Sequence, residues 1–387
     1  MSVPFCKAKC SFCNFASGVF AEARIDGYIE RLAEEMRGAR AFAAQLGAEL
    51  PGRVDSIYFG GGTPSLLELA VIARMFAGLR GEFDVAADAE MTVECAPGQM
   101  SDAGLEGWQR EGVNRLSFGV QSFVDRECMA VGRLHTGAEC RAELARMQAA
   151  GVSRLGIDLI VGLPHQTEAS WRYSVEQAVE SGVEHVSMYM LEVDEDSRLG
   201  REAIAGGARY GAAALPDEDR VADWYQMGCE WLDAAGLRQY EISNFARAGG
   251  ESRHNRKYWE RKPYVGFGLD AHSMLRTGLG GVRWANPDEM NGYVGLMGER
   301  GFTRTVDTVS KESAFEEALF LGLRLVDGVE LASLDADFEM NGLITGPVVE
   351  MVEAGLVVAE RGRLRLTGRG RMASNEVFGR LLVGAEV

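Results

Sequence analysis

Three cysteines near the N-terminus, Cys6, Cys10 and Cys13, have the type and spacing of metal ligands. Thiolates bind iron–sulfur clusters and zinc alike. Structural zinc usually takes four ligands in two spaced pairs, and no fourth Cys or His lies near this loop in the sequence. Three thiolates on a four-iron cluster leave one iron open to an exchangeable cofactor. The spacing therefore favours a [4Fe–4S] cluster, with a zinc site completed by a distant residue as the alternative.

A glycine-rich loop, Gly60-Gly61-Gly62-Thr63-Pro64, follows a predicted strand over residues 54–59. Glycines let a backbone approach a ligand closely and leave its N–H and C=O groups available for hydrogen bonds. The loop lacks both the Lys of a phosphate-binding P-loop and the spacing of a dinucleotide fingerprint. A plain tight turn explains it equally well, and its place after a strand favours a site.

Polar residues stand at or just beyond the ends of other predicted strands. They are Glu94, Gln121 and Asp158, with Arg133 in the loop that follows the Gln121 strand. A carboxylate inside an apolar strand is costly to bury unless it serves a site, and an Arg there could pair with a ligand carboxylate. Each alone is compatible with a structural role. Together they predict a pocket for a zwitterion with a ribose attached.

Short apolar runs alternate with helical patterns along the first two thirds of the chain, which predicts an α/β fold with a partial (β/α) barrel. Active sites of such folds gather at the carboxyl ends of the strands. We expect a core domain over residues 1–236 and a connecting segment over 237–303. The predicted strands cover residues 54–59, 91–95, 114–119, 155–161, 185–191 and 238–242.

A small winged-helix-like domain is predicted over residues 304–387. Helical patterns cover residues 311–325 and 343–354, and two short strands flank the turn Arg361-Gly362, which is typical of a β-hairpin. Six Arg against one Glu over residues 361–380 raise the alternative of nucleic-acid binding. The expected interpretation is an exposed hairpin packed on the barrel, because no side chains suited to reading bases are evident.

Composition narrows the functional classes. The 387 residues carry a formal net charge of −17, which argues against broad nucleic-acid binding. No signal peptide and no apolar run long enough for a membrane span is visible. Seven Cys in uneven positions do not resemble a secreted disulfide framework, so a reducing cytoplasm is expected.

Taken together, the motifs resemble those of radical S-adenosylmethionine proteins. The cysteine loop is followed by Phe-Gly-Gly-Gly-Thr-Pro-Ser, Gly-Val-Gln-Ser-Phe, Gly-Leu-Pro and Tyr-Glu-Ile-Ser-Asn-Phe-Ala. This set is similar to the group that contains oxygen-independent coproporphyrinogen III oxidase and the haem chaperone HemW. The resemblance implies that the three cysteines bind the cluster. It also implies that S-adenosylmethionine contacts Gly61, Gly62, Thr63, Glu94, Gln121, Arg133 and Asp158.

Two features resemble the chaperone more than the oxidase. The oxidases carry a further Cys two residues after the third ligand, where this chain has Phe15. His254 begins His-Asn-Arg-Lys-Tyr-Trp, which is similar to a motif associated with haem binding, and imidazole is a common axial ligand of haem iron. The resemblance implies haem as a ligand, a haem-accepting apoprotein as partner, and no oxidase turnover. A surface His with ordinary hydrogen bonds is the alternative for His254, and homodimerisation is left open.

Several positions depart from the family pattern. His165, Asp270 and Ala96 replace residues that are usually Gly, Gly and Asn, and His165 is a second candidate to face haem. The family's cofactor-contacting Tyr, six residues before the first Cys, would precede Met1. Either the start site is set too late or the first strand is weakened. Against the chaperone stand two alternatives: a coproporphyrinogen III oxidase, and a non-catalytic protein that binds zinc or nucleic acid.

Overall fold

The computed structural model describes residues 1–295, 303–339 and 344–381. Its main sheet is open and eight-stranded, in the order β1-β2-β3-β4-β5-β6-β8-β7, and its first six strands are parallel. The expected α/β fold with a partial barrel is confirmed. The strands are β1 Ser2–Val3, β2 Arg53–Gly61, β3 Asp84–Cys95, β4 Arg115–Gln121, β5 Arg154–Val161, β6 His185–Met190, β7 Arg238–Gln239 and β8 Asn244–Ala246.

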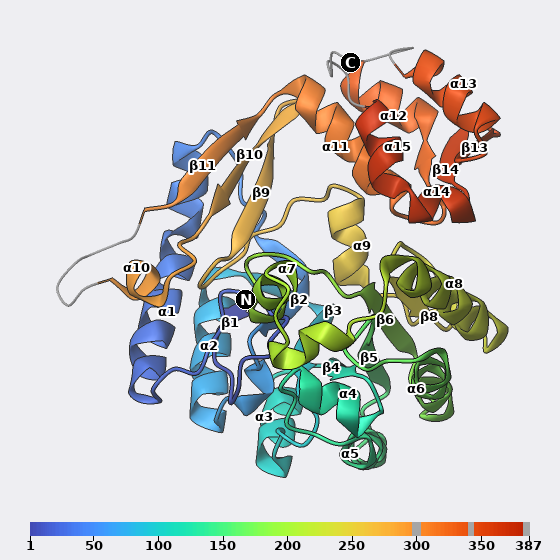
Figure 1. Cartoon of the computed structure of the whole chain (residues 1–387). Coiled ribbons are helices and arrows are strands. Elements are labelled where there is room, and N and C mark those ends of the chain that lie inside the picture. The colour runs from blue at the N-terminus through green and yellow to red at the C-terminus, as the bar shows by residue number, and fades with distance from the viewer. Residues whose placement is uncertain (296–302, 340–343, 382–387) are drawn as a thin grey trace.

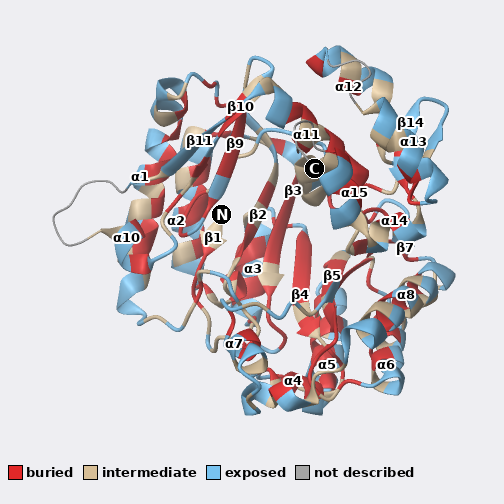
Figure 2. Cartoon of the chain, turned by 45° about the horizontal axis from the view of Figure 1, so that its top comes forward, coloured by how far each residue is buried: buried red, intermediate tan, exposed pale blue. Residues whose placement is uncertain are grey.

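Crossover helices lie around the outside of this sheet (Figure 1). Helix α1 buries Tyr28, Ile29, Leu32 and Met36, which share one face because they recur at helical spacing. Figure 2 shows buried strands inside and exposed helix faces outside. The helices of this part are α1 Ala23–Gln45, α2 Leu69–Glu82, α3 Asp102–Arg110, α4 Asp125–Ala130, α5 Gly137–Ala149, α6 Glu168–Glu180, α7 Arg198–Ile204 and α8 Glu218–Ala234, with 3-10 turns at Pro64–Leu66 and Arg209–Ala214.

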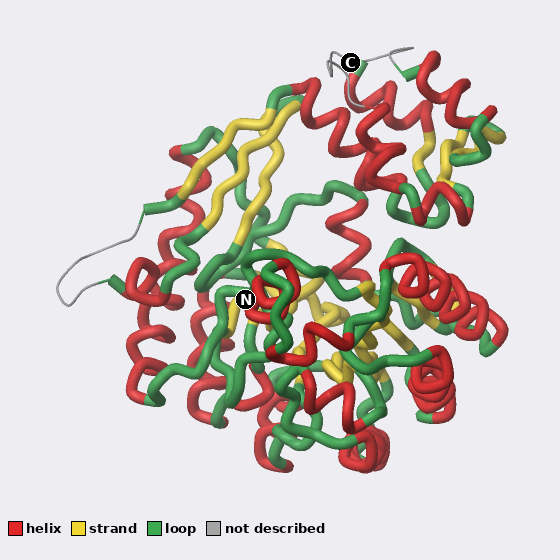
Figure 3. Tube along the Cα trace, in the orientation of Figure 1, coloured by secondary structure: helices red, strands yellow, loops and turns green. Residues whose placement is uncertain are grey.

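The segment after β8 contains structure that the sequence reasoning did not predict. Helix α9 spans Arg253–Trp259, α10 spans Met290–Val294, and an antiparallel sheet has the order β11-β10-β9. Figure 3 shows this sheet as three long strands set apart from the parallel one. The expected strand over 238–242 was too long, since β7 ends at Gln239 and pairs antiparallel with β8. The three strands are β9 His272–Thr277, β10 Gly280–Ala285 and β11 Thr305–Val309.

The C-terminal part has its own hydrophobic core, in which Phe315, Leu319, Met351 and Leu364 are almost fully buried. Its hairpin turns at Arg361 and Gly362, both with positive φ, as the two-residue turn predicts. Helices beside a small sheet confirm the winged-helix-like interpretation, although Leu343, the first residue of one predicted helix, lies outside the described residues. The elements are α11 Lys311–Leu323, β12 Val329–Glu330, α12 Leu331–Phe338, α13 Thr345–Glu353, β13 Val357–Glu360, β14 Arg363–Leu366, α14 Gly368–Met372 and α15 Ser374–Leu381.

The arginines of this C-terminal part contact the domain itself. Arg363 donates to the carbonyl of Asp327, and Arg365 pairs with Glu360 at 3.3 Å. These contacts favour a hairpin packed on its own domain, where packing on the barrel was expected, over a nucleic-acid surface. No helix in the described ranges has the length and apolar character that crossing a bilayer demands.

The short first strand depends on the glycines at the end of β2. Ser2 and Val3 pair in parallel with Gly60 and Gly61, and the Gly62 N–H donates to the Val3 carbonyl at 2.8 Å. A side chain on Gly62 would place its Cβ 2.7 Å from the Val3 oxygen and 2.8 Å from the Phe5 oxygen. The first strand and the cysteine loop that follows it can therefore lie here only because position 62 is glycine.

We predict that Gly62→Ala lowers the free energy of unfolding by about 1–3 kcal/mol, because backbone atoms cannot move aside as a flexible side chain can. Thermal and urea unfolding measure the loss. Gly81→Ala on α2 is the matched control, since a Cβ there meets nothing within 4 Å. Equal stability of the two variants would contradict the prediction.

Candidate functional site

The three predicted cluster cysteines lie on the loop after β1. Cys10 is buried, whereas Cys6 and Cys13 are partly buried, and all three are free thiols. Two predicted cofactor residues reach them. The Thr63 hydroxyl donates to Cys6 Sγ at 3.7 Å, and Arg133 Nη1 donates to Cys10 Sγ at 3.4 Å. The loop after β2 and the loop between α4 and α5 thus both contact the cysteine loop.

The cysteines also influence one another electrostatically. Burial raises the pKa of the Cys6 thiol, and the nearby Cys13 and Cys10 act in the same direction. Within residues 1–295, 303–339 and 344–381, no three Cys, His, Asp or Glu side chains converge as ligands of one metal ion. A four-iron cluster takes each thiolate on a different iron, so it does not need such convergence. The donor set on this loop is chemically suited to the cluster.

The glycine loop does something other than expected. Its N–H groups were expected to be available to a ligand, but the structure engages them internally. The Gly60, Gly62 and Thr63 amides donate to carbonyls of residues 1, 3 and 5 at 3.1, 2.8 and 2.8 Å. The Gly61 amide donates to Glu94 Oε2 at 3.1 Å. Gly61 and Gly62 therefore hold the first strand and a site carboxylate in place through their amides.

Glu94 and Asp158 line one cavity of about 410 Å³ together with Cys13 and Gln121. Burial and then the charge of Asp158 raise the pKa of Glu94 to about 7, although the Tyr58 hydroxyl donates to Glu94 at 2.9 Å. Burial likewise raises the pKa of Asp158. The cavity thus holds two carboxylates that a cationic ligand would stabilise in their charged forms.

Gln121 and Arg133 meet beside Gly119 at the end of β4. Gln121 has a φ of 67°, a left-handed conformation that costs energy for a residue with a side chain. A Cβ on Gly119 would lie 3.0 Å from Gln121 Nε2 and 3.3 Å from Arg133 Nη2. Arg133 also donates to the Gly119 carbonyl, and its buried Nε has no partner among the described residues. Arg133 is not among the residues that line either cavity.

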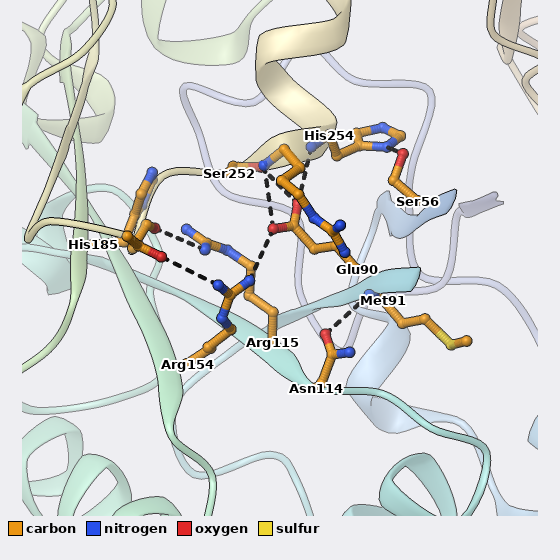
Figure 4. Close-up of polar contacts among 12 residues, drawn as sticks. Ser56, Glu90, Met91, Asn114, Arg115, Arg154, His185, Ser252 and His254 are labelled. Carbon is orange, nitrogen blue, oxygen red and sulfur yellow. Dashed lines mark hydrogen bonds and ion pairs between the residues drawn. The ribbon is translucent and has the colours of Figure 1, made fainter. Parts of the chain in front are cut away.

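His254 is partly buried on helix α9 and is not a loop residue (Figure 4). Its Nδ1 lies 3.1 Å from Ser56 Oγ, its Nε2 lies 3.1 Å from the Tyr258 hydroxyl, and its ring stacks on Tyr58 at 5.1 Å. Burial lowers the pKa of His254 to about 3, so the imidazole is neutral at physiological pH. The buried Glu90 fixes its backbone, accepting from the His254 N–H at 2.9 Å.

His254 lines a second cavity, of about 480 Å³, whose walls include Phe267 and Leu275. Phe15, Tyr58 and Glu94 border both cavities, so the cysteine side of the site and the His254 side are neighbours.

His165, the second candidate to face haem, lies apart from both cavities. It takes a φ of 68° in the loop after β5, and its N–H donates to the Ala214 carbonyl at 2.9 Å. Asp270, the other position that is usually Gly, has a φ of 56°.

Sequence reasoning missed Tyr58, Arg115 and His185, which line the cavities from the sheet. Strand periodicity could have found one of them, Tyr58. Thr92 stands two residues before Glu94 on β3, so the two side chains share one face of the strand. The register pairs Thr92 with Tyr58 on β2, which places Tyr58 on the same face of the sheet.

Comparisons with known proteins show which families this chain resembles. Residues 2–178 match the radical SAM superfamily, and residues 309–373 match the HemN C-terminal domain. A Bacillus subtilis protein named haem chaperone HemW is 32% identical over 98% of this chain and 97% of its own length. A mitochondrial protein of Bos taurus, named radical S-adenosyl methionine domain-containing protein 1, is 33% identical over 95% of this chain and 83% of its own.

Among solved structures, the coproporphyrinogen III oxidase HemN of Escherichia coli superposes with a TM-score of 0.81. The two chains are 22% identical over 98% of this chain and 88% of the oxidase, which establishes a shared fold. With its near full-length similarity to proteins named HemW, this chain belongs to the HemW family of the radical SAM superfamily.

Proposed function

We propose that this chain is a haem chaperone, which binds haem and a [4Fe–4S] cluster coordinated by S-adenosylmethionine and passes the haem to an acceptor apoprotein. The observation that carries the proposal is the pair of neighbouring cavities. One lies beside the cysteines, and the other lies beside the neutral, partly buried imidazole of His254. The similarity to proteins named haem chaperone HemW supports the same assignment.

Cys6, Cys10 and Cys13 would hold the cluster, and the cavity beside Cys13 would hold S-adenosylmethionine. The ligand's ammonium and sulfonium are positive, which matches the two carboxylates Glu94 and Asp158. The proposed partner of its carboxylate is Arg133, which has a buried Nε without a partner among the described residues and lies behind the residues that line this cavity. When bound, the cluster would supply electrons to the sulfonium. The chain's own residues bind and orient the ligand and keep water from it.

Haem binding at His254 requires an exchange of partners. Because Nε2 contacts Tyr258 and Nδ1 contacts Ser56, one hydrogen bond must open before iron can take a ring nitrogen. We expect the hydrogen bond between Nε2 and the Tyr258 hydroxyl to open first, because Tyr258 lies on the same helix face as His254 and its hydroxyl is at the end of the side chain. A neutral imidazole needs no deprotonation to become a ligand.

The oxidase alternative has the shared fold in its favour, and Phe15 against it. Phe15 is 62% exposed and borders both cavities, at the position where the oxidases carry a further Cys. A side chain without a titratable proton cannot take part in proton or electron transfer there. The zinc or nucleic-acid alternative rests only on the cysteine loop and on arginines that contact their own domain.

Binding of S-adenosylmethionine should weaken as pH falls through about 7, because the charged form of Glu94, whose pKa is about 7, is the one that pairs with a ligand cation. Between pH 7.5 and 5.5 we expect affinity to fall by up to about tenfold per pH unit. Glu94→Gln should bind about 10- to 100-fold more weakly, with a shallower pH dependence left by Asp158. Anaerobic calorimetry on cluster-loaded protein measures both. Glu106→Gln on exposed α3 is the control, and a pH-independent wild type would contradict the assignment.

Haemin titration should give a shifted Soret band in the wild type that is at least about tenfold weaker in affinity for His254→Ala. Tyr258→Phe should bind at least as tightly as the wild type, because it removes the group that competes for Nε2. The wild-type band should stay constant from pH 5.5 to 8, since the pKa of His254 is about 3. His272→Ala, in the same cavity, is the matched control. A band lost in His272→Ala and kept in His254→Ala would overturn the ligand assignment.

Anaerobic incubation of cluster-loaded protein with dithionite, S-adenosylmethionine and coproporphyrinogen III should yield no protoporphyrinogen IX. Chromatography of the porphyrins after oxidation is the measurement, and the same preparation should contain four irons and four sulfides per chain. Catalytic turnover would establish the oxidase instead, and a single zinc per chain would exclude both radical SAM functions.

A further inference from the structure

Arg115 on β4 is a buried cation that forms no ion pair in the described part of the chain. Its side chain is 3% exposed and belongs to the wall of the cavity that holds Glu94 and Asp158. Nη1 donates to the Gly250 carbonyl at 2.9 Å, and Nη2 has no partner. A guanidinium stays charged in any protein environment, so burying it without an anion is costly.

The neighbouring arginine shows the contrast. Arg154 pairs with Arg115 in the register of β4 and β5, and it forms an ion pair with the buried Glu90 at 3.3 Å. Glu90 is also bonded to Ser252 and to the first amides of helix α9. Figure 4 shows Glu90 reaching α9 and Arg154, with Arg115 next to Arg154. Glu90 is therefore engaged elsewhere. Asp158 on the same cavity wall feels the charge of Arg115, which opposes the rise in its pKa, but no contact among the described residues joins the two side chains. Nη2 of Arg115 thus keeps a free donor.

A notch in the sheet lies beside Arg115. Gly156 on β5 is flanked in the register by Ser117 and His185. A Cβ on Gly156 would lie 3.4 Å from both Ser117 Oγ and His185 Nδ1, in ordinary contact. Because glycine has only a hydrogen atom there, the space between Ser117 and His185, which both line the cavity, stays open.

Two buried polar groups around this notch have no partner in the part of the chain that the structure describes. Ser117 is not one of them, since its hydroxyl donates to Asp158 at 3.3 Å. The Tyr240 hydroxyl accepts from the Ser252 N–H at 3.3 Å and lies 2.9 Å from His185 Nε2. Burial holds the pKa of His185 well below its usual value, so the ring is neutral, and the tautomer that accepts from Tyr240 at Nε2 carries its proton on Nδ1. That Nδ1 and the buried hydroxyl of Thr92 have no partner among the described residues.

We propose that Arg115, His185 and Thr92 form a carboxylate subsite around the Gly156 notch. In the register of the sheet the notch and His185 are level with Glu94, whereas Arg115 and Thr92 lie two residues deeper. The subsite thus adds a cation below the carboxylates Glu94 and Asp158 of the same cavity. A ligand that carries both charges is thereby oriented. The proposal rests on the proposed function for its ligands. The carboxylate has two sources: a propionate of haem, or the carboxylate of S-adenosylmethionine, which would then bind here in place of Arg133.

The test compares each ligand with its counterpart that lacks a free carboxylate. Haemin is measured against haemin dimethyl ester by Soret titration, and S-adenosylmethionine against its decarboxylated form by calorimetry, both on anaerobic cluster-loaded protein. The wild type should prefer the free acid of one pair by at least about tenfold, as expected of a charge-assisted contact. Arg115→Met should reduce that preference to below about threefold. The pair that responds identifies the source of the carboxylate.

Gly156→Ala fills the notch without a clash and serves as the second variant, which keeps Arg115 in place. It should also lower the preference, while unfolding remains within a few degrees of the wild type. Arg172→Met on exposed α6 controls for the change in net charge. Loss of preference in both site variants and not in the control supports the subsite.

Unchanged preferences for both pairs in Arg115→Met and Gly156→Ala would overturn the proposal and leave the notch to water. Failure of the proposed function gives a different result, because the wild type would then bind neither haemin nor its dimethyl ester. In that case the S-adenosylmethionine pair still tests Arg115.

Discussion

The contact between the first strand and residues 60–62 is the constraint on which the site depends. Parallel pairing at Gly60 and Gly61 fixes the strand, and the bare α-carbon of Gly62 lets three backbone carbonyl groups come within reach. The cysteine loop starts directly after this strand, so its position is set by the same pairing. Gly60 acts on the other side, since a Cβ there would lie 2.9 Å from the Glu94 carboxylate. One glycine run thus positions the cluster ligands and the first carboxylate of the cavity.

Charge is distributed unevenly over the cavity beside Cys13. Burial raises the pKa of both Glu94 and Asp158, and the charge of Asp158 adds to the rise at Glu94, whose pKa is about 7. Arg115, deeper in the same wall, is a cation without a paired carboxylate. Proteins bury charges when a partner repays the loss of water. Here two carboxylates and the guanidinium of Arg115 face one cavity, which is the arrangement expected for a ligand that is itself a zwitterion.

The sequence predicted the parallel strands because each is apolar and is followed by a helical pattern, and it predicted the site residues because they stand at strand ends. It did not predict the sheet of β9, β10 and β11. Strand β9 reads His272-Ser273-Met274-Leu275, in which three consecutive residues are buried, so strict alternation is absent. The role of the glycine loop was also ambiguous, because a close approach of backbone to ligand and of backbone to backbone require the same residue. Arg115 and His185 were missed because periodicity shows which residues share a face of a strand, but not which face borders the cavity.

The two cavities are joined by a short chain of contacts. The His254 ring stacks on Tyr58, and the Tyr58 hydroxyl donates to Glu94, whose other oxygen accepts from Gly61. A cation that binds Glu94 strengthens the acceptor of the Tyr58 hydrogen bond by keeping the carboxylate charged. A ligand that binds His254 must open the contact with Tyr258 and can move the ring against Tyr58. Occupation of one cavity therefore changes the wall of the other, and the size of that coupling is limited to the energies of one stacking contact and one charge-assisted hydrogen bond.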